Sequence, residues 1–569
     1  MMSPFSRLMT SSYVYAILLV AVKIAMCACP QQCSCDDVIS GNGGLRIGCR
    51  GRALTDRVVG GGKFFIPPET EELDVGRNRI SAVDWLATLA APWLLRLYAD
   101  RCEIRRIGGG AFSDLRSLEY IDLSFNHIDH LAREAFSGLP RLRALRLDSN
   151  RLEALGPNIF RGLTLSILRL DENLIQDVDA LAFKDAEVET LNLDGNRLDR
   201  ISGRAMRPLR SSLRNLTVSR NTVPLEIESD AFVGFSFAVV RVRSSGIQSV
   251  KFIEDVAAVE SLDVGDNDLG GLTLAWSAAL ALGCREVRLD AVGLERFDAA
   301  LATSLRSARF LDLSANRLSD VDPGAFRPLA DLRRLDLSRN QLTRSPPNFS
   351  RHISTVERLN LSSNSISNVE SRSLAGLSRL RQLDLSGNRI QVLPDSLETV
   401  LAPVESFDVS RNPLHCNCEL AWLRRWLESP ALASRHPHNA RSLRCHSPGT
   451  PAPLLERPAS VFTCSTPAIV SSTASRNVPE GSDVVLACTA EGDPTPNVKW
   501  ASPFGDVVSV TPPDDRQQRR LSAIWQIRRA RSHHSGWYRY CALEIIFTNL
   551  SHLAMHRTIG RLLGGADVK

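Results

Sequence analysis

The segment Leu380–Ile390, LRQLDLSGNRI, carries the pattern that decides the fold: L-x-x-L-x-L-x-x-N-x-L, with isoleucine in the last place. Leu383 and Leu385 alternate with Asp384, as in a short strand whose apolar residues share one face and whose polar residue points to the other. Asn388 follows at the turn, where its amide can both donate and accept hydrogen bonds. One such unit cannot bury its leucines alone, so copies of it must stack.

The same pattern recurs in phase along most of the chain, with about 24 residues between successive asparagine positions. Fifteen units result, and their asparagine positions hold Asn78, Cys102, Asn126, Asn150, Asn173, Asn196, Asn221, Ser245, Asn267, Val292, Asn316, Asn340, Asn364, Asn388 and Asn412. Many units add a phenylalanine that would fill the convex side: Phe112, Phe136, Phe160, Phe183, Phe232 and Phe326. The sequence therefore predicts an α/β-type solenoid with a curved parallel sheet and a mostly irregular convex side.

The composition is that of a soluble globular protein. Of the 569 residues, 44% are hydrophobic and 23% are charged, and the formal net charge is +5. This balance argues against a nucleic-acid binder, which is usually far more basic. No stretch has the spacing of a catalytic, phosphate-binding or metal-ligating motif. We therefore expect no enzyme activity, no cofactor and no metal.

Cysteines gather at both ends of the repeat region. Five of the thirteen lie within Cys27–Cys49 and four within Cys416–Cys464, and Cys488 and Cys541 follow. Such clusters are typical of disulfide-bonded caps in an oxidising compartment. Residues 1–28 resemble a secretory signal peptide in length and apolarity. We expect a protein that is secreted or lies on the extracellular face of the plasma membrane, without a transmembrane segment or lipid anchor in this chain.

Besides Ser245, three residues in the middle of the chain depart from the repeat pattern. Cys102 takes an asparagine position and Cys284 the first leucine position, so both should be buried, unbridged thiols. Val292 also replaces an asparagine, and valine offers the loop backbone no hydrogen bond. We therefore expect the loop near Val292 to be rearranged or bridged by water.

A second domain follows the repeats. In VVLACTAEGDPTPNVKW, Trp500 lies twelve residues after Cys488, and HSGWYRYC ends at Cys541. This arrangement resembles an immunoglobulin domain and implies an all-β sandwich over 466–562 with a Cys488–Cys541 disulfide. Arg539 stands where the family has a tyrosine, so we expect a bulge or an irregular register in this strand.

The repeats and their flanks resemble the extracellular leucine-rich-repeat family. CPQQCSC followed by Cys49 is similar to the family's N-terminal cap, and NPLHCNCELAWLRRWL followed by Cys445 and Cys464 is similar to its C-terminal cap. The resemblance implies the disulfides Cys29–Cys35, Cys33–Cys49, Cys416–Cys445 and Cys418–Cys464. The expected domains are a signal peptide (1–28), an N-terminal cap (29–64), repeats (65–414), a C-terminal cap (415–465), an immunoglobulin-like domain (466–562) and a tail (563–569).

As a whole, the chain resembles the leucine-rich-repeat and immunoglobulin family of cell-surface proteins. The fifteen repeats are similar to the branch that restrains growth-factor receptors, and the WASPFG segment is similar to the branch related to Nogo-receptor-interacting proteins. The resemblance implies protein recognition in cell adhesion, neuronal wiring or receptor signalling. Growth-factor receptors or neuronal receptors are the partners it implies, and a homo-oligomer is compatible with it. The alternatives are a structural matrix protein resembling leucine-rich proteoglycans and a Toll-like innate pattern receptor.

Each strand has one outward position between its two inward residues, and these positions map the concave face. In order they hold Asp74, Tyr98, Asp122, Arg146, Arg169, Asn192, Thr217, Arg241, Asp263, Arg288, Asp312, Asp336, Asn360, Asp384 and Asp408. Two groups near this row have residue types that are common in protein interfaces. One group is Tyr98, Tyr120 and Phe125, and the other is Arg220, Val239, Arg241 and Arg243.

Charge pairing distinguishes the second group. Arg146, Arg169 and Arg288 each have an aspartate two residues on, whereas Arg241 and Arg243 have none on their own strand. We therefore expect Arg241 and Arg243 to be available to a partner, although Asp263 on the next strand can pair with one of them.

Four N-x-S/T sequences are candidate glycosylation sites, at Asn215, Asn348, Asn360 and Asn549.

Overall fold

In the computed structural model, two compact units divide the chain, residues 1–316 and residues 317–569. The structure describes residues 29–37, 44–61, 64–221, 224–269, 283–345, 349–429, 443–446, 451–472, 477–478, 481–493, 498–501, 507–510, 520–529, 536–540 and 557–564. The predicted signal peptide and three predicted site residues, Asn348, Cys541 and Asn549, lie outside the described residues.

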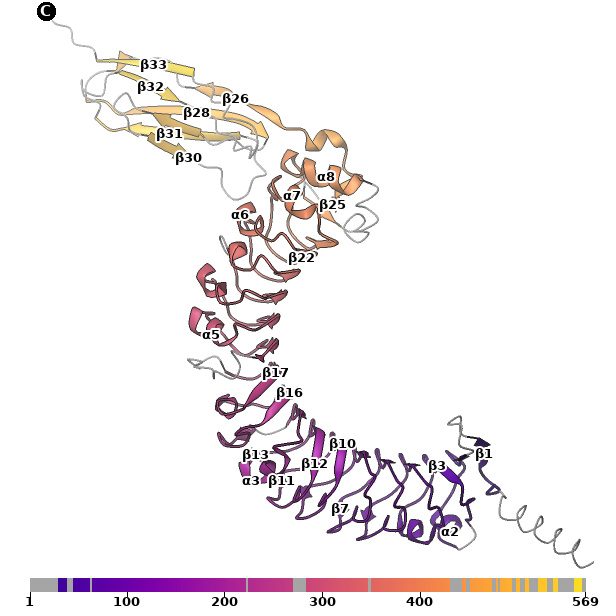
Figure 1. Ribbon diagram of the computed structural model, residues 1–569. Helices are drawn as coiled ribbons and strands as arrows, with labels where there is room; N and C mark the ends of the chain where they lie inside the picture. Colours follow the sequence, from indigo (N-terminus) through magenta and orange to yellow (C-terminus); the bar gives the residue numbers. More distant parts are fainter. Residues whose placement is uncertain are drawn as a thin grey trace, which may run out of the picture. The chain divides into compact units, whose positions relative to one another are not determined.

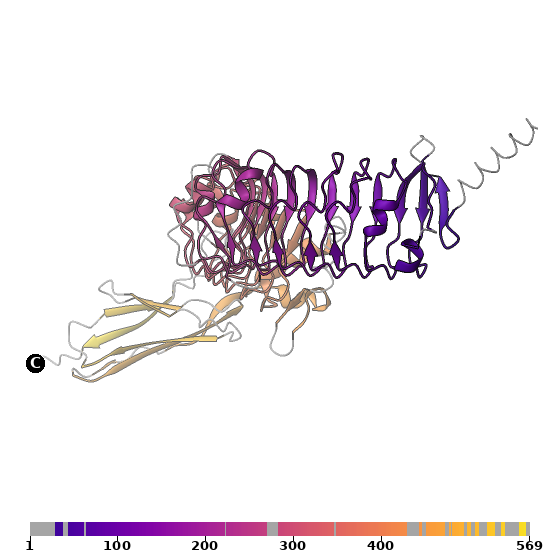
Figure 2. The same cartoon turned by 90° about the horizontal axis from the view of Figure 1, so that it is seen from below.

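A 17-stranded sheet runs through the repeats. Its first two strands belong to the N-terminal cap and are antiparallel, β1 (Ser34–Asp37) and β2 (Leu45–Gly48). The strands of the first unit then stand side by side (Figures 1 and 2): β3 (Thr70–Asp74), β4 (Arg96–Tyr98), β6 (Tyr120–Asp122), β8 (Ala144–Arg146), β10 (Thr164–Arg169), β12 (Glu187–Asn192), β14 (Asn215–Thr217), β16 (Ser236–Arg241), β17 (Ala258–Asp263), β18 (Glu286–Arg288) and β19 (Phe310–Asp312). The second unit adds β20 (Arg334–Asp336), β21 (Arg358–Asn360), β22 (Gln382–Asp384) and β23 (Ser406–Asp408). Each of these fifteen repeat strands ends at a predicted outward position, which confirms the repeat register.

From β2 onward, strand pairing within the first unit is parallel, and the repeat strands keep equivalent positions aligned. Asp74 lies opposite Tyr98, and Tyr98 lies opposite Asp122. The inward residues between these outward positions, such as Leu97 and Ile121, are fully buried. Outward side chains of neighbouring repeats therefore form continuous columns across the concave face.

Phenylalanines pack the opposite side of the first unit, as the sequence predicts. Phe112, Phe136, Phe160 and Phe183 are buried and stack in a row, with successive ring centroids 5.7, 6.3 and 5.5 Å apart. The segments that return to the sheet contain short helices: α2 (Asp56–Val59), η1 (Asp84–Thr88), α3 (Gly203–Met206), η2 (Arg207–Leu209), η3 (Lys251–Ile253) and α5 (Ala299–Ser304). They also contain two-stranded sheets: β5 (Arg106–Ile107) with β7 (His130–Leu131), β9 (Ala154–Leu155) with β11 (Asp177–Val178), and β13 (Arg200–Ile201) with β15 (Glu226–Ile227).

The asparagine positions of successive repeats, which we call the ladder positions, hold each turn in shape. Asn126 is typical: its Nδ2 donates to the carbonyl oxygens of Ala99 (2.8 Å) and Leu123 (3.0 Å), and its Oδ1 accepts from the Ile104 N–H (3.2 Å). The amide thus satisfies backbone groups of its own repeat and of the preceding repeat. The residue before each ladder position adopts a left-handed backbone, as at Phe125 (φ 55°).

Cap elements close both ends of the repeats. The N-terminal cap contains the disulfides Cys29–Cys35 and Cys33–Cys49, and the C-terminal cap contains Cys416–Cys445 and Cys418–Cys464, the pairs that the sequence predicts. In the second unit, helix α8 (Ala421–Glu428) buries Trp422, Leu423, Trp426 and Leu427. The remaining short elements of the repeats and the cap there are η4 (Pro323–Phe326), η5 (Phe349–Arg351), α6 (Ser371–Leu374), α7 (Leu397–Leu401), η6 (Cys418–Leu420), β24 (Arg444–Cys445), β25 (Ala452–Pro453), η7 (Leu454–Glu456) and η8 (Ala459–Phe462).

Two β-sheets follow the cap. One contains β26 (Ser465–Ser472), β28 (Val484–Asp493) and β31 (Arg520–Ile527), and the other contains β27 (Asn477–Val478), β33 (Arg557–Gly564), β32 (Gly536–Tyr540), β29 (Val498–Ala501) and β30 (Val507–Val510). The pairing of β32 with β33 shifts register between Trp537 and Arg539, which confirms the expected irregularity. The last strand continues to Gly564, past the predicted boundary at 562, because Leu563 and Gly564 pair with β27. Over the described part of the chain, no helix combines the length and apolarity that a membrane span requires.

Candidate functional site

A hollow of about 500 Å³ lies on the outward face of the first strands of the first unit. Strands β2, β3, β4, β6 and β8, with the turns that follow them, supply its lining: Arg46, Arg50, Asp74, Arg77, Tyr98, Asp100, Arg101, Tyr120, Asp122, Ser124, Phe125 and Arg146. We call this set the Tyr98 hollow. It contains all three members of the aromatic group that the sequence predicts.

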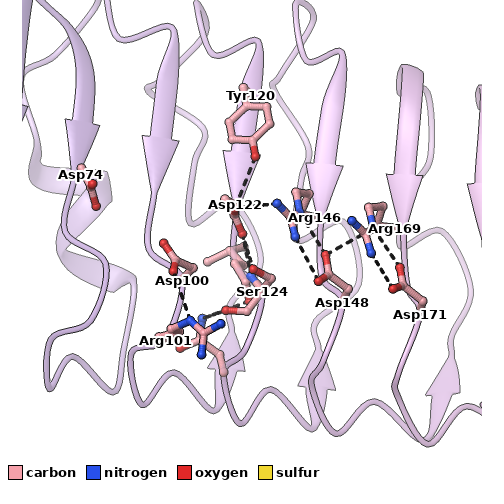
Figure 3. Close-up of polar contacts among 12 residues, drawn as sticks. Asp74, Asp100, Arg101, Tyr120, Asp122, Ser124, Arg146, Asp148, Arg169 and Asp171 are labelled. Atoms are coloured by element: carbon pink, nitrogen blue, oxygen red, sulfur yellow. Dashed lines mark hydrogen bonds and ion pairs between the residues drawn. The ribbon is translucent and has the colours of Figure 1, made fainter. Parts of the chain in front are cut away.

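Two tyrosines form one wall of the Tyr98 hollow. The rings of Tyr98 and Tyr120 come from adjacent strands and lie 5.2 Å apart between centroids, tilted by 44°. Both rings are half-buried, and this burial is the main reason that the pKa of each phenol is raised above its ordinary value. The hydroxyls therefore stay protonated at physiological pH and can donate hydrogen bonds. Tyr120 already donates to Asp122 (3.3 Å), as Figure 3 shows.

Phe125 stands at the edge of the hollow with 44% of its surface exposed. The guanidinium carbon of Arg101 lies 4.0 Å from the centre of its ring, a cation–π contact. Both residues occupy the left-handed position before a ladder residue, so they are neighbours in one column. Arg101 is thereby held against an aromatic face that is itself open to solvent.

The three carboxylates of the hollow are buried and already bound. Asp100 accepts two hydrogen bonds from Arg50, at 2.8 and 2.6 Å. Asp122 accepts from the Ser124 N–H (2.9 Å) and hydroxyl (2.6 Å) and pairs with Arg146 at 3.3 Å. Asp74 pairs with Arg50 at 3.2 Å and accepts from the Gly76 N–H. Because these charges lie below the surface and are compensated, the accessible charge of the hollow is that of its arginines.

A row of alternating charges continues from the hollow along the same face (Figure 3). Arg146 binds Asp148 at 3.0 Å, and Arg169 binds Asp171 at 2.7 Å and lies 3.7 Å from Asp148. These are the same-strand pairs that the sequence predicts for Arg146 and Arg169. The row is internally neutralised and therefore offers a partner little unsatisfied charge.

The second predicted group, around Arg241, differs from the expectation. Arg243 is not available: it binds Asp290 at 2.8 Å and Asp263 at 3.1 Å. It reaches Asp290, two strands away, because Gly265 stands between them and has no side chain there. The same contact makes the predicted pair of Arg288 with Asp290 wrong.

Arg288, which lies outside that group, has its guanidinium 5.0 Å from the centre of the Phe310 ring. Within the group, Arg220 is exposed but pairs with Glu172 at 2.8 Å. Arg241 is 47% exposed and only 4.0 Å from Asp263, while Val239 is half-buried beside it. Of the two arginines that we expected to be available, Arg241 thus keeps its accessibility.

Both described glycosylation candidates lie in sheet strands. The Asn215 Nδ2, which would carry the glycan, donates to the Thr190 hydroxyl at 3.0 Å, and the Asn360 Nδ2 donates to Asp336 at 2.9 Å. A glycan at either site would take one of the two Nδ2 hydrogens and leave a single N–H to donate. No group of three or more histidine, cysteine or acidic side chains in the described ranges could hold a metal ion.

Sequence reasoning missed four of the five arginines of the Tyr98 hollow, namely Arg46, Arg50, Arg77 and Arg101. Two of them lie in the N-terminal cap, and two lie at the left-handed turn position, whereas the sequence map covered mainly the outward strand positions. Aligning all turn positions in columns would have placed Arg77, Arg101 and Phe125 beside one another.

Comparison with known proteins agrees with this architecture. The family model described as leucine rich repeat matches residues 92–152, 163–223, 285–342 and 332–390, and the model described as immunoglobulin domain matches residues 466–542. The chain carries leucine-rich repeats followed by an immunoglobulin domain. These families are typically recognition modules, and no catalytic family is indicated.

Curated relatives match short segments of this chain. It is 39% identical over 100 residues to mouse leucine-rich repeat and fibronectin type-III domain-containing protein 5, which is 17% of this chain and 12% of the relative. It is 36% identical over 118 residues to rat protein 4 of the same series, covering 20% of this chain and 15% of the relative. The chain thus matches only about an eighth of the length of these relatives.

A solved structure titled as the Toll–Spatzle complex of Drosophila matches 69% of this chain and 51% of that chain, with 19% identity and a TM-score of 0.46. This likeness is too low to carry an argument about function.

Proposed function

We propose that this protein is an extracellular recognition module that binds protein partners through the Tyr98 hollow. The observation that carries the proposal is a concave site walled by tyrosines and lined by arginines. Tyrosine and arginine are the residue types that most often dominate protein-binding energy, and a hollow lets their groups be desolvated. Cell adhesion, neuronal wiring or modulation of a receptor would each use such a module.

The repeat architecture supports recognition over catalysis. The described carboxylates of the hollow are each bound to a guanidinium, a hydroxyl or a backbone N–H, so none is poised to exchange a proton with a substrate. The alternation of buried acids and arginines also differs from the continuous basic track that nucleic acids require. The disulfide-bonded caps support an extracellular location.

The direct test is binding of the purified, fluorescently labelled chain to cultured cells. Treatment of the cells with trypsin separates protein partners from lipid or glycan partners. We expect the double variant Tyr98→Ala/Tyr120→Ala to bind at least tenfold more weakly, because a desolvated aromatic hot spot is worth about 2 kcal/mol or more.

The matched control is Phe65→Ala/Trp93→Ala. These two aromatic side chains are 74% and 64% exposed and do not line the hollow. The control should bind as the parent does, and thermal melting should show that both variants remain folded. Full binding by the tyrosine variant, or trypsin-resistant binding by the parent, would contradict the proposal.

A further inference from the structure

Two guanidinium groups are exposed at the rim of the Tyr98 hollow, and they belong to adjacent repeats. Arg77 and Arg101 both stand at the left-handed turn position, with φ of 57° and 53°, and both side chains are exposed. Turn positions of successive units are neighbours across the sheet, about 4.8 Å apart. The two guanidinium groups can therefore reach a single anionic group that enters the hollow.

Neither guanidinium has a strong anionic partner, and the Arg101 guanidinium rests on the ring of Phe125. Arg77 forms no ion pair with any described residue, and Arg101 lies 4.0 Å from Asp100. That carboxylate is already occupied, because it accepts two hydrogen bonds from Arg50. Arg46, by contrast, is paired with Glu72 at 2.9 Å. The unsatisfied positive charge of the hollow is thus concentrated at Arg77 and Arg101.

We propose that the Tyr98 hollow binds an acidic protein segment through a sulfated tyrosine. A sulfate ester presents three terminal oxygens, so it can accept hydrogen bonds from two guanidinium groups at once, whereas one carboxylate is matched by a single guanidinium fork. The aryl ring that carries the sulfate would lie against Tyr98 and Tyr120, where aromatic pairs gain from edge or offset contacts. This inference rests on the proposed function and specifies the partner's chemistry.

A sulfated polysaccharide shares the sulfate chemistry but fits the surface less well. A polysaccharide needs a track of arginines, yet the next arginines along the face, Arg146 and Arg169, are bound to Asp148 and Asp171. One localised anion beside aromatic rings favours a peptide side chain.

The test uses the full chain and a fluorescein-labelled acidic pentapeptide with a central sulfotyrosine, compared with the same peptide carrying unmodified tyrosine. We expect the sulfated peptide to bind at least tenfold more tightly, with an affinity that falls as salt concentration rises. Arg77→Glu/Arg101→Glu should abolish this preference, because two charges are reversed at the site.

The matched control is Arg339→Glu/Arg411→Glu, which makes the same charge changes at exposed left-handed turn positions of the second unit. This variant should keep the preference for the sulfated peptide. Equal binding of the two peptides would overturn the inference, and so would stronger competition by a heparin dodecasaccharide than by the sulfated peptide. Cell binding that depends on Tyr98 and Tyr120 would still support the proposed function in either case, so the two failures are distinguishable.

Discussion

Asp194 is a carboxylate of the concave face whose surroundings disfavour its charge. It is half-buried, and its Oδ1 accepts a hydrogen bond from the Ser219 N–H at 2.6 Å. Burial is the main reason that the pKa of Asp194 is raised, although the Ser219 hydrogen bond and the nearby charge of Arg220 act to lower it. The native state therefore holds this proton more tightly than the unfolded chain does.

The raised pKa predicts how stability depends on pH at this residue. Ionised Asp194 costs stability at neutral pH, and the cost disappears as pH falls through the raised pKa. Asp194→Asn removes the charge and keeps an oxygen for the Ser219 N–H. We expect the variant to melt at a higher temperature than the parent at pH 7, and the difference to shrink in acid. A variant that melts lower at pH 7 would show that attraction to Arg220 outweighs burial.

The substituted ladder positions show how single residues are accommodated. Ser245 donates from its hydroxyl to the Val218 carbonyl at 2.9 Å, and the Cys102 thiol makes a weaker contact with the Val75 carbonyl at 3.4 Å. Val292 has no such donor. The Oδ1 of an asparagine at position 292 would accept a hydrogen bond from the Leu269 N–H. That N–H instead donates to the Val292 carbonyl oxygen at 3.0 Å. The expected rearrangement near Val292 is therefore a switch from a side-chain acceptor to a backbone acceptor.

Across strands, the concave face is tied together by arginine clamps that each span a glycine. Arg50 and Asp100 meet across Gly76, and Arg243 and Asp290 meet across Gly265. In both cases the arginine and the aspartate come from strands or turns two apart, and the intervening glycine leaves the space where they join. A Cβ atom on Gly76 would lie 2.6 Å from both Arg50 Nη1 and Asp100 Oδ1.

The clamp geometry predicts a cost for one methyl group. Gly76→Ala should lower the free energy of unfolding by about 1–3 kcal/mol, because the added Cβ overfills the site and separates a buried carboxylate from its guanidinium. Chemical denaturation of the purified chain measures this change. Gly108→Ala is the control, since the atom nearest to its added Cβ would be Asp84 Oδ1, at an ordinary contact distance of 3.7 Å. An alanine at 76 that is as well tolerated as one at 108 would mean that the clamp adds little.

In the second unit, most outward strand positions hold aspartate, and these aspartates have a structural role. Asp336, Asp384 and Asp408 each accept a hydrogen bond from the backbone N–H of the serine two residues later, at 2.9, 2.8 and 2.8 Å. The D-x-S pattern therefore secures the end of each strand. These aspartates need no partner to explain their presence, which supports placing recognition at the Tyr98 hollow.

For the molecule as a whole, the sequence predicts the features that recur in every repeat. It does not predict pairings that depend on how far a single side chain extends. The spacing of ladder residues places every repeat strand, because one register serves all units. The pairing of Arg243 with Asp290 was not predictable from neighbouring strands, since it depends on the absence of a side chain at Gly265. The aromatic residues of the Tyr98 hollow were predicted as a group, whereas four of its arginines were not, because these four come from the cap and the turns.

The two thiols in the middle of the chain report on how tightly the repeats are packed. Cys102 and Cys284 are buried and unbridged, and burial is the main reason that their pKa values are raised, to about 11 and about 12. Thiol alkylation requires both access and the thiolate form, and the fold withholds both. In the native chain at pH 8, N-ethylmaleimide should label neither residue; after unfolding in guanidinium without reductant, it should label both, as peptide mass spectrometry would show. The cap disulfides should stay unlabelled throughout. Labelling of either thiol in the native state would mean that the repeats open locally, and a disulfide involving either one would contradict the repeat register.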